Sequence, residues 1–178
     1  MTDPDRDLQT ALIAEIPAAE PVVGQHRARL DRSAALGVPA HVTILFPFAP
    51  PGRLGAAELI RLGELFAVVP AFDVRLDHTE WFGTSVLWVG PEDPAPFREL
   101  TARVFAAFPD YPPYEGRFED AVPHLTIGED SPVDEMCRAE DQVAGLLPVL
   151  DRVSAVTLIA ESSPGGRWKT RASFALGV

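Results

Sequence analysis

Residues 41–44 read His-Val-Thr-Ile, and residues 124–127 read His-Leu-Thr-Ile. In an extended strand, side chains two positions apart point to the same side. Each histidine therefore shares a side with the threonine two residues later, and the aliphatic residues of the motif face the other way. Each motif predicts a strand with one apolar side for the core and one polar side, where an imidazole stands beside a hydroxyl.

The doubling of this motif is its most informative property. The chain has four histidines, and only His41 and His124 have a hydroxyl residue two positions later; His26 and His78 do not. One histidine with a hydroxyl residue two positions later can easily occur by chance. Two such histidines in similar apolar strands are rarely expected by chance. Both histidines could instead satisfy buried carbonyl groups at strand edges. Since polar groups on such strands need partners, we expect a shared polar cleft.

The pattern of apolar residues, prolines and glycines predicts alternating strands and helices along the chain. Strands are expected at 11–16, 40–48, 72–78, 85–89, 122–127, 153–161 and 168–176, and helices at 26–36, 55–69, 95–108 and 134–147. Most connections are short, which favours antiparallel sheets and an α+β fold over a parallel, doubly wound one.

The two halves of the chain show nearly constant offsets between matching segments. His124 follows His41 by 83 residues (124 minus 41), and the strands beginning at 153 and 168 follow those at 72 and 85 by 81 and 83 residues (153 minus 72, 168 minus 85). These offsets predict that residues 1–178 form a single bilobal domain. Its two lobes, each strand–helix–strand–strand, would be related by a pseudo-twofold axis.

The charge of the chain limits its partners. It has 15 Lys and Arg against 26 Asp and Glu, a net charge of −11, and 47% of its residues are hydrophobic, which is enough for a core. An acidic surface repels extended polyanions, so we do not expect duplex DNA as a partner. Any nucleic-acid contact should depend on a local basic patch and cover only a few nucleotides.

Other features point to a cytoplasmic protein. Cys137 is the only cysteine, so no disulfide can form within the chain, and no Cys/His cluster suggests zinc. The acidic N-terminus does not resemble a signal peptide, and no apolar run approaches the ~18–20 residues of a membrane span. The sequence thus predicts a monomer with no metal, no cofactor and no membrane contact.

The two tetrapeptides resemble the paired motifs of the 2H phosphoesterase superfamily, and within it the bacterial 2′-5′ RNA ligase-like (LigT-like) proteins. The Tyr-Pro-Pro-Tyr stretch at 111–114, which precedes the second motif, is similar to one bacterial branch. The resemblance covers nearly the whole chain, but its specific part is the two motifs. It implies a bilobal fold with both motifs facing a central groove, and cofactor-free cyclic phosphodiesterase or RNA-end activity.

The chemistry of the motif residues agrees with that activity. Opening a 2′,3′-cyclic phosphate needs a base to activate water and an acid to protonate the departing sugar oxygen. His41 and His124, with ordinary pKa values near ~6.5, can share these roles at neutral pH. Thr43 and Thr126 can donate hydrogen bonds to the non-bridging oxygens. The reverse reaction would be 2′-5′ ligation; we expect hydrolysis, and the sequence leaves open which histidine is the base.

Substrate contacts are predicted beside the motifs. Phe48 and Tyr114 are candidates to stack on an unpaired base, and Arg167 and Lys169 are candidates to bind a phosphate. Each has a structural alternative: an aromatic residue can belong to the core, and a cation can lie on a solvated strand face. Trp81 is a further aromatic candidate, whereas Trp88 and Trp168 occupy matching places that favour core packing.

The expected substrate is a cyclic nucleotide or an RNA 3′-end. Two alternatives remain open on the sequence: a phosphodiesterase for the cyclic phosphate of another metabolite, and a non-catalytic module that binds nucleotides or RNA. Intact histidines in both motifs favour an enzyme.

Overall fold

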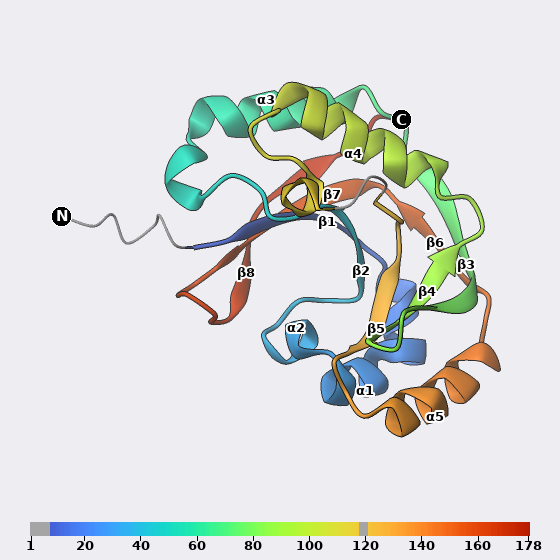
Figure 1. The fold of residues 1–178 in the computed structure, drawn as a ribbon. Helices are drawn as coiled ribbons and strands as arrows, with labels where there is room; N and C mark the ends of the chain where they lie inside the picture. The colour runs from blue at the N-terminus through green and yellow to red at the C-terminus, as the bar shows by residue number, and fades with distance from the viewer. Residues whose placement is uncertain (1–7, 118–120) are drawn as a thin grey trace.

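The computed structural model describes residues 8–117 and 121–178. These residues form two four-stranded sheets with helices on their outer faces (Figure 1). The first sheet has the strand order β2-β1-β7-β8 and the second has the order β5-β4-β3-β6. Every strand pair is antiparallel, which confirms the predicted α+β class.

The strands of the first sheet are β1 (Thr10–Glu15), β2 (His41–Leu45), β7 (Ala155–Glu161) and β8 (Trp168–Ala175), and those of the second are β3 (Phe72–Phe82), β4 (Val86–Pro91), β5 (Leu125–Glu129) and β6 (Val149–Val153). The α-helices are α1 (Glu20–Leu30), α2 (Arg32–Ala35), α3 (Ala56–Ala67), α4 (Ala95–Ala107) and α5 (Val133–Ala144). None of the helices described is long and apolar enough to span a membrane.

Each motif strand occupies the edge of its sheet, and its alternation is the one predicted. In β2, Val42 and Ile44 are almost completely buried, whereas His41 and Thr43 are only partly buried. In β5, Leu125 is likewise fully buried. The apolar side of each strand therefore belongs to the core, and the other side is left for the polar groups of the motif.

The helices link the two sheets into one structure. α1 connects β1 to β2 of the first sheet but packs on β5 of the second, and α4 connects β4 to β5 but packs on β2. Figure 1 shows α3 and α4 over the first sheet and α1 and α5 beside the second. Since each sheet is covered by a helix from the other, both contribute to one hydrophobic core.

The amphipathic spacing of α3 explains how it covers its sheet. Leu62 and Phe66 are fully buried, and Phe66 packs against Phe174 of β8 with ring centroids 5.8 Å apart. The backbone N–H of Gly55 donates to the Glu58 carboxylate at 2.9 Å, which satisfies a free amide at the start of this helix. The helix predicted at 55–69 is thus confirmed, one residue shorter at its start and two at its end.

One strand was not predicted. The strand expected at 153–161 is β7, which begins two residues later and pairs with β1 of the first sheet; directly before it the chain forms β6, which pairs with β3 of the second sheet. The change of sheet takes place at Ser154, without a glycine or proline to mark it in the sequence. The pairing partners decide this break, and they are distant in the sequence.

The two sheets do not correspond to the two halves of the chain. The second sheet uses the continuous segment from β3 to β6, whereas the first combines β1 and β2 with β7 and β8. β3 and β7 are equivalent, as the offset of 81 residues suggested: counted from the motif strand at the edge, each is the third strand of its sheet. The offset that matched the strand at 85–89 with that at 168–176 was misleading, because β4 is second and β8 is fourth in its sheet.

Candidate active site

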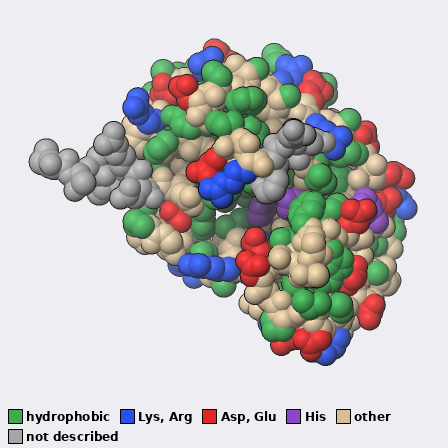
Figure 2. Space-filling model, in the orientation of Figure 1, with side chains coloured by type: hydrophobic (Ala, Val, Ile, Leu, Met, Phe, Trp, Pro, Cys, Tyr) green, Lys and Arg blue, Asp and Glu red, His purple; other side chains and the backbone are tan. Residues whose placement is uncertain are grey.

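The two motif strands meet where the edges of the two sheets approach each other, and β2 contacts β5 directly. Between the sheets lies a cavity of about 570 Å³ that is lined by His41, Thr43, His124 and Thr126. Figure 2 shows histidine side chains in a hollow on this face of the molecule. The cavity has the size of a site for one small ligand, such as a mononucleotide.

The two histidines are held in the same way. Nδ1 of His41 lies 2.7 Å from the carbonyl oxygen of Pro39, and Nδ1 of His124 lies 2.7 Å from that of Val122. A carbonyl oxygen only accepts hydrogen bonds, so Nδ1 carries the proton and donates it in both residues. In the neutral ring, Nε2 is then the unprotonated nitrogen, which can accept a proton from a substrate or water.

Burial changes the acidity of both histidines. It lowers the pKa of His41 to about 4; the nearby Arg27 and His124 act in the same direction, and the bond to Pro39 and the charge of Asp31 oppose it. Burial also lowers the pKa of His124, against the raising effect of its bond to Val122. Both imidazoles are therefore mainly neutral at pH 7 when no anion is bound.

Thr43 has a partner from a distant loop. Its side chain is hydrogen-bonded to Tyr114, which lines the same cavity, and burial raises the pKa of the Tyr114 phenol. The Tyr114 backbone N–H also donates to the Phe46 carbonyl at 2.7 Å. Tyr114 and Glu115 both have positive φ angles, 50° and 57°, a costly conformation for non-glycine residues that is often found at functional sites.

The surroundings of His124 are aromatic. The ring of Phe82 lies edge-on to it at a centroid distance of 4.9 Å, and that of Trp88 lies at 5.8 Å. Trp88 is only 3% exposed, which agrees with the predicted core role, whereas Phe82 lines the cavity. These rings restrict the orientation of the imidazole and shield it from water.

The first sheet contributes an apolar wall to the cavity. Six residues form it, namely Ala11, Ile13, Val38, Phe46, Ile159 and Trp168. Phe46 and Trp168 pack edge to face with centroids 6.2 Å apart. An apolar surface with aromatic rings can take the ring of a base beside the polar groups of the motifs.

A buried ion pair supports the loop that ends at His41. Arg27 donates to Asp31 Oδ2 through Nε at 3.0 Å and Nη2 at 2.8 Å, and both side chains are 2% exposed. Arg27 Nη2 also donates to the Val38 carbonyl at 3.2 Å. Asp31 accepts from the Ser33 backbone N–H at 2.9 Å and from its hydroxyl at 2.8 Å, so it caps α2.

The structure separates the predicted substrate contacts. Tyr114 lies in the cavity, but Phe48 is 3% exposed and packs in the core against Phe108 and Tyr111. Arg167 and Lys169 do not line the cavity, and Trp168 between them does. We therefore leave Phe48, Arg167 and Lys169 out of the substrate contacts.

A register shift in β8 accounts for the position of these cations. β8 has one extra residue between the positions that pair with Leu158 and Ile159, so the sides of the strand exchange there. Trp168 consequently faces the cavity, whereas Phe174 faces the core. Arg167 lies beside Gly37, at the turn before β2.

Trp81 has a structural partner instead of a place in the cavity. Its indole Nε1 donates to a Glu140 carboxylate oxygen at 2.9 Å, and the Thr79 hydroxyl donates to the other oxygen at 2.9 Å. These bonds attach α5 to β3. They give Trp81 a packing role.

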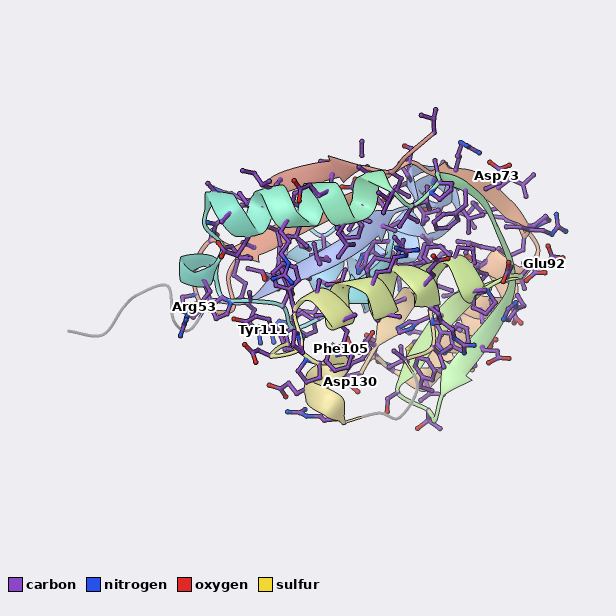
Figure 3. All side chains as sticks on the ribbon, turned by 90° about the horizontal axis from the view of Figure 1, so that it is seen from above. Arg53, Asp73, Glu92, Phe105, Tyr111 and Asp130 are labelled. Carbon is purple, nitrogen blue, oxygen red and sulfur yellow. The ribbon has the colours of Figure 1, made fainter. Side chains whose placement is uncertain are left out.

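No three His, Cys, Asp or Glu side chains in residues 8–117 and 121–178 are grouped as a metal ion would require. A second hollow lies on the outer surface of the second sheet and is lined by charged residues that include Asp73, Glu92 and Asp151. Figure 3 shows Asp73 and Glu92 at the periphery of the molecule. The paired motifs thus mark the first cavity as the site.

A comparison with models of protein families identifies the family of the chain. The model of the 2′-5′ RNA ligase superfamily matches residues 10–164, which include both motifs and most of both sheets. The chain belongs to this superfamily. The resemblance found in the motifs is thereby confirmed for the 2′-5′ RNA ligase superfamily, of the 2H phosphoesterase type.

Solved structures of other proteins share the fold. Escherichia coli LigT in complex with 3′-AMP superimposes with a TM-score of 0.59 at 19% identity, over 97% of this chain and 100% of that one. TT0787 of Thermus thermophilus gives 0.60 at 20% identity, over 94% and 97%. LigT has also been solved with NADP⁺ and with ATP. No curated protein matches the sequence significantly.

Several residues that line the cavity were not predicted from the sequence. Asp31 and Ser33 have the spacing of a helix cap, and this signal was available in the sequence. Glu129 lies three residues after Thr126, and it is also part of the cavity. Trp168 was placed in the core, because a register shift in β8 cannot be read from its alternating pattern.

Proposed function

We propose that this protein is a metal-independent phosphodiesterase that hydrolyses 2′,3′-cyclic phosphates of nucleotides or RNA ends. The observation that carries the proposal is the matched geometry of the two motifs in one cavity. Both imidazoles donate through Nδ1 to the carbonyl two residues earlier at 2.7 Å, and each is followed by a threonine that lines the same cavity. Two equivalent proton-transfer groups are what in-line opening of a cyclic phosphate needs.

In this mechanism His41 is the base and His124 the acid. Burial lowers the pKa of His41 to about 4 and so disfavours a second proton on that ring, and Nε2 of His41 accepts a proton from the attacking water. His124 donates a proton to the departing ribose oxygen, and the negative charge of a bound phosphate favours its protonated form. The O–H of each threonine donates to a non-bridging oxygen, where negative charge increases in the transition state.

Tyr114 is proposed to position Thr43. Its phenol is bonded to the Thr43 side chain, so it fixes the direction of the hydroxyl before the substrate arrives. No matching partner of Thr126 is present among the described residues. The base of a nucleotide is proposed to lie on the wall formed by Phe46 and Trp168.

The first test of the proposal is hydrolysis of 2′,3′-cyclic nucleotides in the presence of EDTA. We expect turnover to a single phosphomonoester that is unaffected by the chelator. Short RNA with a 2′,3′-cyclic end, measured in parallel, distinguishes an RNA-end enzyme from a mononucleotide enzyme. No turnover of either substrate class would contradict the proposal and favour a binding module.

Replacing the threonines should slow catalysis without preventing binding. Thr126→Val removes the hydroxyl but keeps the shape, and we expect kcat to fall by on the order of 10² because one transition-state donor is lost. Thr126→Ser keeps the hydroxyl and should retain most of the activity. Equal losses in the two variants, measured by steady-state kinetics, would show that packing and not the hydroxyl is responsible.

The lowered pKa values predict an acidic pH optimum for the free enzyme. His41 must be neutral to act as the base, so kcat/KM should rise as the pH passes about 4. His124 must be protonated, and its pKa lies below 6.5, so kcat/KM should fall tenfold per pH unit above 6.5. A pH profile of kcat/KM checks both limbs; a plateau that extends to pH 8 would contradict these assignments.

The same site could join ends through a 2′-5′ bond when a ribose hydroxyl replaces water, and we propose that hydrolysis prevails. We further propose a cytoplasmic monomer that does not bind duplex DNA, in accordance with the net charge of −11. A cyclic phosphate from another metabolite is the second candidate substrate, favoured by the small volume of the cavity.

A further inference from the structure

The charges that line the cavity are all negative among the residues the structure describes. Its polar lining consists of the motif residues, Ser33 and Tyr114, and its charged lining consists of Asp31 and Glu129. No lysine or arginine of the described chain joins them. This is unusual for a site that is expected to receive a phosphate, because such sites commonly contain a cation.

Asp31 does not present a free charge to a ligand. Its carboxylate accepts two hydrogen bonds from Arg27, at 2.8 and 3.0 Å, and two from Ser33, and it is 2% exposed. Its charge is therefore compensated by the guanidinium beside it. The positive charge of Arg27 is compensated by Asp31 in turn. Arg117, in the loop that holds Tyr114, forms an ion pair with Glu115.

Glu129 is the uncompensated charge of the cavity. Its carboxylate has no ion pair and no side-chain hydrogen bond within the described part of the chain, and it lies at the end of β5, three residues after Thr126. The residue is exposed to solvent at the cavity edge, but partial desolvation of its carboxylate and the nearby carboxylates of Asp31 and Asp130 raise its pKa. It also acts electrostatically on Tyr114, and both residues line the cavity that contains Thr43.

Such a carboxylate distinguishes ligands by their charge. A 2′,3′-cyclic phosphate is a monoanion, whereas a phosphomonoester carries ~1.5–2 negative charges at pH 7. Two like charges at one cavity repel each other, and water screens this repulsion only in part; no lysine or arginine among the described residues lines the cavity to offset it. A ligand with an additional terminal phosphate brings its extra charge to the same cavity, whose only charged lining residues among those described are acidic.

We infer that Glu129 is a specificity-determining residue that restricts this site to small cyclic phosphodiesters with a single negative charge and rejects ligands with a terminal phosphate. The inference rests on the proposed function and narrows its substrate class. It favours a 2′,3′-cyclic nucleoside phosphate with a free 5′-hydroxyl over the same compound with a 5′-phosphate. The same repulsion would help to expel the phosphomonoester product.

The test compares adenosine 2′,3′-cyclic phosphate with the same compound carrying a 5′-phosphate, at pH 8, where the 5′-phosphate is fully ionised. For the wild-type protein we expect kcat/KM to be at least tenfold higher for the compound without the 5′-phosphate. Glu129→Gln, which keeps the size of the side chain, should reduce this preference to less than threefold. The matched control is Asp130→Asn, which removes the neighbouring charge outside the cavity and should leave the preference unchanged.

Binding of the same two compounds, measured by titration calorimetry, separates this inference from the proposed function. If neither compound is hydrolysed but the wild-type protein prefers the one without 5′-phosphate and Glu129→Gln loses the preference, the inference holds and the proposed reaction does not. If both are hydrolysed with the same preference in wild type and Glu129→Gln, the inference is overturned and the reaction stands. Failure to bind either compound overturns both.

Discussion

His41→Ala and His124→Ala should each lower kcat for 2′,3′-cyclic nucleotides by on the order of 10²–10⁴, the range for loss of one general acid or base. Both imidazoles line one cavity and are held by equivalent Nδ1 hydrogen bonds. Residues that act as a unit show non-additive losses, so the double variant should be little slower than the worse single variant. Single-turnover kinetics in EDTA measures the chemical step directly.

A second substrate distinguishes the roles of the two histidines. A phosphodiester with 4-nitrophenolate as leaving group needs little protonation on departure. It should therefore restore much of the activity of His124→Ala, where the acid is lost, but not that of His41→Ala, where the base is lost. The reverse pattern would exchange the two roles, and equal impairment of both variants would contradict separate roles.

The matched control for these variants is His78→Ala. His78 lies on β3 of the second sheet, 43% of its side chain is exposed, and its Nδ1 lies 2.6 Å from the carboxylate of the adjacent Asp77. It does not line the cavity. Its replacement should leave kcat unchanged, and a loss comparable to that of the motif histidines would show that the assay reports folding rather than chemistry.

Asp31→Ala should lower the free energy of unfolding by about 3–5 kcal/mol, the usual cost of leaving one partner of a buried ion pair unpaired. Arg27 is 2% exposed, so its guanidinium would stay buried with only the more exposed Glu20 carboxylate, 3.9 Å away, as a partner, and α2 would lose its cap from Asp31 to Ser33. Urea denaturation followed by circular dichroism measures the change. The loop that ends at His41 should also lose its fixed position.

The exposed pair Arg103–Glu99 provides the control for this prediction. It has the same four-residue spacing on a helix and a contact of 2.8 Å, but 43% and 56% of the two side chains are exposed. Exposed pairs of this spacing contribute only about 0.3–0.5 kcal/mol, so Glu99→Ala should have a small effect. If Asp31→Ala cost no more than Glu99→Ala, the buried pair would have no structural role.

The local features of the fold could be predicted from the sequence because they depend on neighbouring residues. Alternation in 41–44 and 124–127 decides which side of each strand is apolar, and the buried Val42 and Leu125 agree with it. The spacing of Leu62 and Phe66 decides the face of α3. The paired motifs likewise indicated the family, which the match over residues 10–164 confirms.

The tertiary structure decided everything that depends on pairing between distant segments. The break at Ser154 exists because the residues before it pair with β3 and those after it pair with β1. The register shift in β8 turned Trp168 toward the cavity and Arg167 away from it, against the simple alternation. Neither event has a turn residue that would mark it in the sequence.

The charge of the site was also decided by tertiary structure. From the sequence, Arg167 and Lys169 were the expected cations. Asp31 could be recognised there only as a possible helix cap, and nothing distinguished Glu129 from the other acidic residues. Folding brings Arg27 and Asp31 together as a buried pair, and it places Glu129 beside the motifs. The sequence by itself therefore determined the candidate reacting groups, because they are encoded within four residues. Only the packing of two sheets determined which charges surround them.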